Sequence, residues 1–190
     1  MDKIKTIGNE KFLSAQSVLN SILSSLNENE PEVASEIIAN NKNLWNNSEN
    51  LLRLTQILSQ FDIVQIMDTL VNTLPFNQIS SILFSSILDK ANFENIIKVI
   101  SPNLTMPMKN TLLYKAAGEG DFTRTKILID LLDFDSTIIN MITNMLIGMN
   151  SLNMLVLITS KYANILDEDV ISRMVRNIMV TLPDRIIEQN

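Results

Sequence analysis

Apolar residues recur at helical spacing along almost the whole chain. In the first predicted helix Leu19, Ile22, Leu23 and Leu26 lie three or four residues apart, and similar spacing continues towards the C-terminus. This spacing gathers the apolar side chains on one side of a helix, whereas a half-buried strand would alternate apolar and polar residues. No segment stands out as a strand, so we predict an all-α protein without a β-sheet.

Prolines, glycines and clusters of small polar residues divide the apolar pattern into separate helices. The pattern predicts about ten to twelve helices in a single domain that covers residues 1–190. The predicted helical segments are 12–26, 33–38, 51–58, 61–74, 76–88, 93–100, 107–118, 122–132, 136–147, 151–162, 170–182 and a short last helix that starts at Pro183. The expected N-terminal caps are Ser48, Asp135 or Ser136, Ser151 and Asp167.

The apolar pattern also repeats with a period near thirty residues. One series consists of Val33, Ile63, Phe93, Phe122, Leu152 and Leu182, and a second consists of Ile37, Met67, Ile97, Ile127, Leu157 and Ile187. Apolar residues make up 46% of the chain, so two such series indicate a repeat without proving one. We therefore predict helical hairpins repeated as a solenoid, with a layered array of helices as the alternative.

Residues 111–129 carry the clearest single repeat. Thr111 and Leu113 open a helix, Ala116 and Ala117 follow, Gly120 stands at a turn, and an aliphatic run at 127–129 ends a second helix. In this pattern the segment resembles the ankyrin repeat. The resemblance implies a pair of packed helices and a protein-binding surface, with no catalytic site.

The rest of the chain departs from the ankyrin pattern. Leu112 stands where ankyrin repeats have proline, and Tyr114 stands where they have histidine. The whole chain has four glycines, too few for the glycine-containing turns of a regular ankyrin array. The resemblance thus implies a degenerate, ankyrin-like array of repeats, and a bundle that only looks repetitive stays open.

Composition excludes several kinds of chemistry. The chain has no cysteine and no histidine, which excludes disulfides, thiol nucleophiles and the commonest general base and metal ligand. Its net charge is −6, and its fifteen basic residues are scattered, so we expect no nucleic-acid partner. We also expect no cofactor and no metal site.

Residues 136–160 contain no charged side chain and are rich in methionine. Asparagines interrupt the segment, and an unpaired amide is costly in hydrocarbon, so we expect a buried helical hairpin and no membrane span. Because the N-terminus shows no apolar signal segment, we expect a cytoplasmic protein. The many Ile and Asn residues suggest a viral or phage source, and in that case a virion-associated location.

Aromatic and methionine side chains are the candidate partner-binding residues, because such side chains anchor many protein interfaces. These candidates are Trp45, Tyr114, Phe122 and Met149. For Trp45 the alternative is a place in the core. The acidic groups around Glu30 and around Asp133 are interpreted as charges near helix ends and not as metal sites.

Two functions remain as sequence-based hypotheses. The first is a non-enzymatic protein-interaction or scaffold module, as a structural or host-interacting component that contacts a protein partner or copies of itself. The alternative is a helical bundle that binds a small apolar ligand or lipid. An enzyme that uses only the carboxylates Asp130, Asp133 and Asp135 is the least favoured hypothesis.

Overall fold

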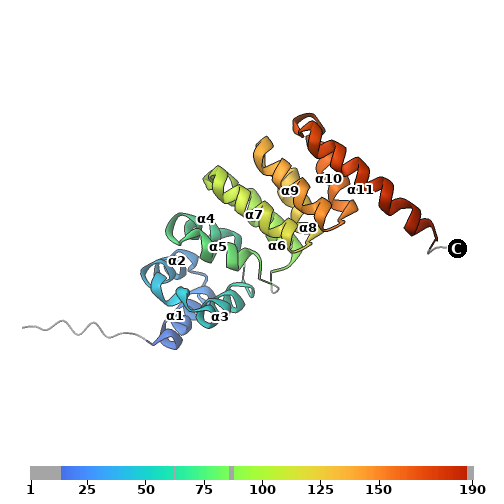
Figure 1. Ribbon diagram of the computed structural model, residues 1–190. Coiled ribbons are helices and arrows are strands. Elements are labelled where there is room, and N and C mark those ends of the chain that lie inside the picture. Colours follow the sequence, from blue (N-terminus) through green and yellow to red (C-terminus); the bar gives the residue numbers. More distant parts are fainter. Residues whose placement is uncertain (1–13, 62, 86–87, 188–190) are drawn as a thin grey trace, which may run out of the picture. The chain divides into compact units, whose positions relative to one another are not determined.

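A computed structural model describes residues 14–61, 63–85 and 88–187, and helices dominate this part of the chain. Eleven α-helices and no strand occur among the described residues, which confirms the predicted all-α class (Figure 1). The helices are α1 (Ala15–Asn27), α2 (Pro31–Asn40), α3 (Ser48–Leu58), α4 (Ile63–Thr73), α5 (Phe76–Leu83), α6 (Lys90–Ile100), α7 (Met106–Gly118), α8 (Phe122–Leu131), α9 (Ser136–Gly148), α10 (Leu152–Tyr162) and α11 (Glu168–Ile187). Three short 3-10 helices are η1 (Lys42–Asn46), η2 (Ser101–Asn103) and η3 (Ala163–Ile165).

The helices form two compact units that divide between Ile87 and Leu88. Helices α1 to α5 belong to the first unit and α6 to α11 to the second. Each unit is described by itself. The single domain predicted for residues 1–190 stays a prediction.

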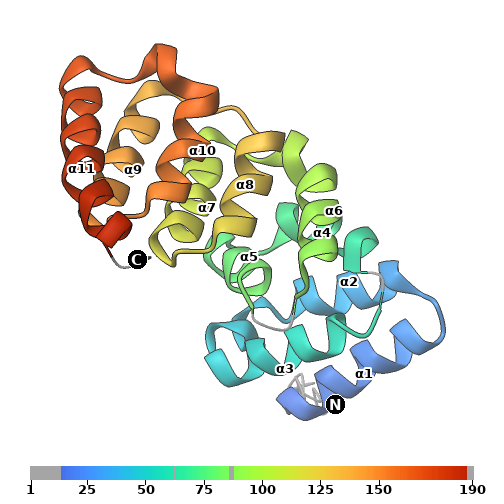
Figure 2. The same ribbon diagram turned by 90° about the vertical axis from the view of Figure 1, so that its right-hand side faces the viewer.

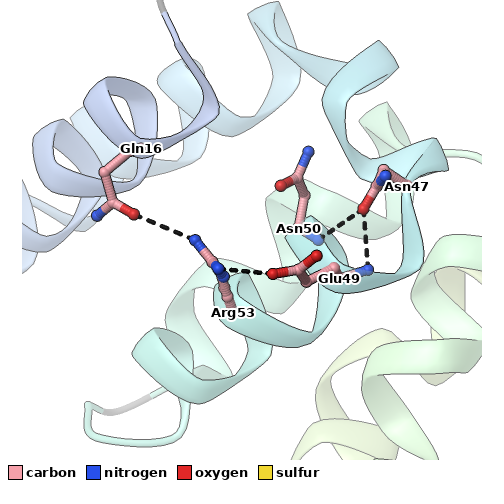
Figure 3. A network of polar contacts seen from close by, with 5 residues as sticks. All are labelled: Gln16, Asn47, Glu49, Asn50 and Arg53. Atoms are coloured by element: carbon pink, nitrogen blue, oxygen red, sulfur yellow. Dashed lines mark hydrogen bonds and ion pairs between the residues drawn. The ribbon is translucent and has the colours of Figure 1, made fainter.

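In the first unit α1 packs against α2 and α3, α2 packs against α4, and α5 contacts both α3 and α4. The start of α3 is capped by Asn47, whose Oδ1 accepts hydrogen bonds from the amides of Glu49 and Asn50 at 3.0 and 3.1 Å (Figure 3). The sequence-based choice of Ser48 as the cap is therefore wrong by one residue. Asn47 has the extended backbone of a cap, whereas Ser48 already lies in the first turn.

Polar contacts tie α3 to α1 at the same place. The Arg53 guanidinium donates to Gln16 Oε1 at 3.3 Å and forms an ion pair with Glu49 at 2.6 Å (Figure 3). The Arg53 and Glu49 side chains are both exposed, so their pair contributes little to stability.

The second unit consists of two rows of helices. The helices α7, α9 and α11 contact one another in order, and α6, α8 and α10 form a second row in the same way (Figures 1 and 2). Contacts between α7 and α8 and between α9 and α10 join the rows as helical hairpins. Apolar side chains between the rows are fully buried in successive helices, as Ile96, Leu128 and Ile158 show.

The two hairpins of the second unit have the same turn. At the end of α7 the Asp121 amide donates to the Ala116 carbonyl at 2.9 Å, and at the end of α9 the Ser151 amide donates to the Leu146 carbonyl at 3.0 Å. Gly120 and Asn150, one residue earlier, have positive φ angles of 72° and 54°. These features define a Schellman turn, which reverses the chain after a helix.

The helices of the second unit repeat at 30 and 32 residues. Those of one row begin at Met106, Ser136 and Glu168, and those of the other begin at Lys90, Phe122 and Leu152. Because the step from α6 to α8 is 32 residues, a constant period of thirty slips by two residues there.

This slip explains the outcome of the two predicted apolar series. In the first series Phe93 is fully buried, whereas Phe122 and Val33 are exposed, so these positions do not share one inward face. In the second series Met67, Ile97 and Ile127 are buried, and Ile37 and Leu157 are half-buried. The side chains of the remaining members lie outside the described residues.

The last helix differs from its prediction, because α11 continues through Pro183 where the sequence predicted a new helix. The proline ring fixes φ near the helical value and removes only one amide donor, so the helix can continue at the cost of one hydrogen bond.

The charge-free segment folds into the hairpin of α9 and α10, as expected. Among the described residues, no helix is both long enough and apolar enough to span a membrane.

Candidate functional site

A groove on the surface of the second unit lies between α7 and α9. Its volume is about 340 Å³, and it is lined by Asn110, Thr111, Tyr114, Ile138 and Met141. Tyr114 and Met141 are 48% and 46% exposed, which is high for side chains of this size. The groove therefore offers an aromatic ring and a flexible thioether side by side.

The repeat places these two side chains together. Position 141 lies thirty residues after Thr111, so Met141 and Thr111 are equivalent positions on neighbouring helices. Tyr114 follows one turn later and lies on the same face of α7. At the edge of the groove the Oδ1 atom of Asn110 accepts no hydrogen bond from the described residues. A molecule bound here could therefore satisfy it with an N–H donor.

A second depression of about 240 Å³ lies between the two Schellman turns. It is lined by Gly120, Phe122, Asn150, Ser151, Leu152, Asn153 and Met154. Phe122 is 42% exposed, and Met149, beside this depression in sequence, is exposed to a similar degree. The structure thus places Phe122 and Met149 at the turns and Tyr114 in the groove between the helices.

Trp45 lies in the core of the first unit. Its side chain is 1% exposed, and its indole N–H donates to the Ile38 carbonyl at 2.9 Å. A ring buried in this way cannot anchor a partner at the surface, so the burial favours the alternative of a core residue. The 3-10 helix η1, within the stretch that the sequence analysis left as a polar gap, turns the ring inward.

The acidic side chains near residue 133 have separate structural roles. Asp135 caps α9 by accepting from the Ile138 amide at 3.0 Å, and Asp130 pairs with Lys126 on the surface of α8. Among the described residues, no cluster of three or more His, Cys, Asp or Glu side chains has the arrangement of a metal site.

Polar fastenings join successive helices of one row. Lys161 and Tyr162 of α10 both donate to the carbonyl of Leu132, at 3.4 and 3.3 Å, and Lys161 also donates to the Ile129 carbonyl. Burial, together with the negative charge of Asp133, raises the pKa of the Tyr162 hydroxyl to about 12. The hydroxyl therefore stays protonated and acts as a structural donor.

Arg124 plays the same part at the other end of α8. Its guanidinium pairs with Asp121 at 2.8 Å, donates to the Leu88 carbonyl at 3.0 Å and lies 5.3 Å from the centre of the Phe93 ring. Arg124 and Asp121 are mostly buried, so this contact belongs to the framework of the repeat.

Sequence analysis identified Tyr114 and missed its neighbours in the groove. Asn110, Thr111, Ile138 and Met141 were not proposed as site residues, although the thirty-residue spacing of Thr111 and Met141 was a usable signal. Comparisons of the chain with protein-family models, with curated proteins and with solved structures give no significant match.

Proposed function

We propose that this protein is a non-enzymatic interaction module and that it binds a segment of another protein along the groove between α7 and α9. The exposed pair of Tyr114 and Met141 carries this proposal. Tyrosine and methionine are enriched at protein interfaces because they offer a large contact area at low entropic cost or with an adaptable shape. The absence of histidine and cysteine from the sequence supports binding over catalysis.

The arrangement of the second unit supports an ankyrin-like solenoid as the framework of this surface. Paired helices repeat at 30 and 32 residues, and Gly120 has the left-handed conformation that the resemblance implies between paired helices. The connection from α8 to α9 is only the segment 132–135, so a long finger between repeats is missing. In such a framework the helices themselves supply the binding surface.

The alternative is a bundle that binds a small apolar ligand or lipid. In the methionine-rich hairpin Met154 is buried, whereas Met141 and Met149 point to the surface, so these side chains do not line one common cavity. Native mass spectrometry of the purified protein would reveal a retained ligand. An intracellular location, a virion-associated one and a viral or phage source stay predictions.

Capture of partners with matched variants tests the proposal. The double variant Tyr114→Ala/Met141→Ala removes both anchors, and Val156→Ala removes an apolar side chain of α10 that is 64% exposed. We expect wild type and Val156→Ala to capture the same protein, and the double variant to bind it at least about tenfold more weakly, since one anchor is typically worth more than 1 kcal/mol.

Circular dichroism and thermal melting establish that all three proteins are folded. Binding constants from titration calorimetry then decide the outcome. Equal affinity of the double variant and wild type for the captured protein would refute the α7–α9 groove as the binding site, and failure of the wild type to bind any protein would refute the function.

A further inference from the structure

The helix α11 is the last member of the row α7, α9 and α11, and it repeats the preceding helices in register. Their first residues are Met106, Ser136 and Glu168, so Gly118 corresponds to Gly148 and to Val180. With 20 residues α11 is also the longest described helix, at about 30 Å.

Contacts within the row identify the side of each helix that its successor covers. A Cβ atom at Gly118 would lie 3.8 Å from Met145 Sδ of α9, so position 118 faces the next helix. On α9 the Ile147 carbonyl accepts a hydrogen bond from Asn177 Nδ2 of α11 at 3.5 Å, which places α11 against the corresponding side. By the same register, this side of α11 carries Val175, Met179 and Val180.

On α11 this side is uncovered. Met179 and Val180 are each 69% exposed, and Val175 is 46% exposed. The equivalent side chains of α7, Leu113 and Ala117, are fully buried. A terminal repeat usually presents a polar outer face, so an apolar strip at this position indicates a further packing surface.

The chemistry of the strip favours a self-complementary partner. Beside it the charge of Arg173 is balanced by Asp169 at 2.8 Å. The Arg176 Nε atom donates back to the Ser172 carbonyl at 3.4 Å, so its stem lies along the helix. The strip itself therefore offers apolar contact and no charge pattern that would select an oppositely charged partner.

We propose that α11 packs against α11 of a second copy of this chain and forms a two-fold symmetric dimer. The pairing continues the helix-on-helix packing of the row, with the partner's helix in the place that a following helix would occupy. In a two-fold interface the same strip is buried on both copies, so one apolar face is sufficient. This surface is separate from the groove that contains Tyr114 and Met141.

Sedimentation analysis from low to high micromolar concentration tests the dimer. The wild type is expected to approach twice the chain mass of 21.5 kDa, and Met179→Glu is expected to weaken the dimer at least about tenfold by placing two charges in an apolar interface. The control Val156→Glu changes a side chain of similar exposure on α10 and should leave the dimer intact.

The absence of cysteine allows a direct test of the contact. Single variants Val175→Cys and Met179→Cys should be joined between copies by a short bis-maleimide, whereas Val156→Cys should not. A wild type that stays monomeric at all concentrations would overturn the proposal. It would also be overturned by a dimer that Met179→Glu leaves unchanged, or by an open-ended series of larger oligomers.

Discussion

Gly120 and Gly148 lie near the ends of equivalent parts of the second unit but have different backbone conformations. Gly120 has a φ angle of 72°, in the left-handed region, whereas Gly148 is the last residue of α9 and has no positive φ. A Cβ atom would meet no other atom within 4 Å at either position. Only the backbone conformation therefore decides the effect of an added methyl group.

Alanine at the two positions should have effects of opposite sign. Gly120→Ala should lower the free energy of unfolding by roughly 1 kcal/mol, because an L-residue is strained in the left-handed conformation. Gly148→Ala should raise it by roughly 0.5 kcal/mol, because alanine loses less backbone entropy than glycine in a helix. Urea denaturation measures both changes, and effects of the same sign would contradict the assigned turn.

Single aromatic residues show how far the sequence reaches at this scale. Trp45 lies in a polar stretch and is buried, while Phe122 lies in an apolar series and is exposed. In both cases the type of residue is uninformative, because burial depends on the rotation of a local helical turn. That rotation follows from η1 for Trp45 and from the 32-residue step before α8 for Phe122.

At the scale of the elements, the helices were predictable because their signals are local. Apolar spacing identified each described helix, and Asp135 caps α9 as one of the two expected candidates. The connections between helices were less predictable. A cap can shift by one residue, as at Asn47, and a proline need not end a helix, as at position 183.

Fastenings between elements can be compared with salt bridges on one element. Arg124→Ala should lower the free energy of unfolding by about 1 to 3 kcal/mol, because it removes a partly buried ion pair, a hydrogen bond to Leu88 and a ring contact. The control Lys126→Ala breaks an exposed pair with Asp130 on the same helix and should cost less than about 0.5 kcal/mol.

Thermal or chemical denaturation of the two variants measures this difference. Equal losses of stability would show that the contacts of Arg124 with Leu88 and Phe93 contribute nothing beyond a surface ion pair.

At the scale of the whole molecule, stability should fall at high pH through Tyr162. Its pKa is about 12 in the folded chain and 10.0 in the unfolded chain, so the unfolded chain loses this proton first. The stabilisation is complete below pH 10 and is lost as the pH rises towards 12. The loss is on the order of 2 kcal/mol.

Denaturation of wild type and Tyr162→Phe at pH values from 9 to 12 measures this loss. Lysines and Tyr114 titrate in both proteins, so the difference between them isolates Tyr162. Phenylalanine also removes the hydrogen bond to Leu132, which lowers stability at all pH values by about 1 kcal/mol. Parallel pH curves for the two proteins would contradict the raised pKa.

The sequence alone determined the all-α class, most of the helices, the chemistry that the missing histidines and cysteines exclude, and the approximate period. These properties depend on local spacing and composition, which do not require knowledge of distant contacts. Tertiary structure decided which apolar side chains are buried. It showed that Trp45 belongs to a core, that Tyr114 and Met141 share a groove, and that Met179 is uncovered on α11. These outcomes depend on the exact step between helices and on which helix has a successor, because a shift of two residues rotates a helix face by more than half a turn.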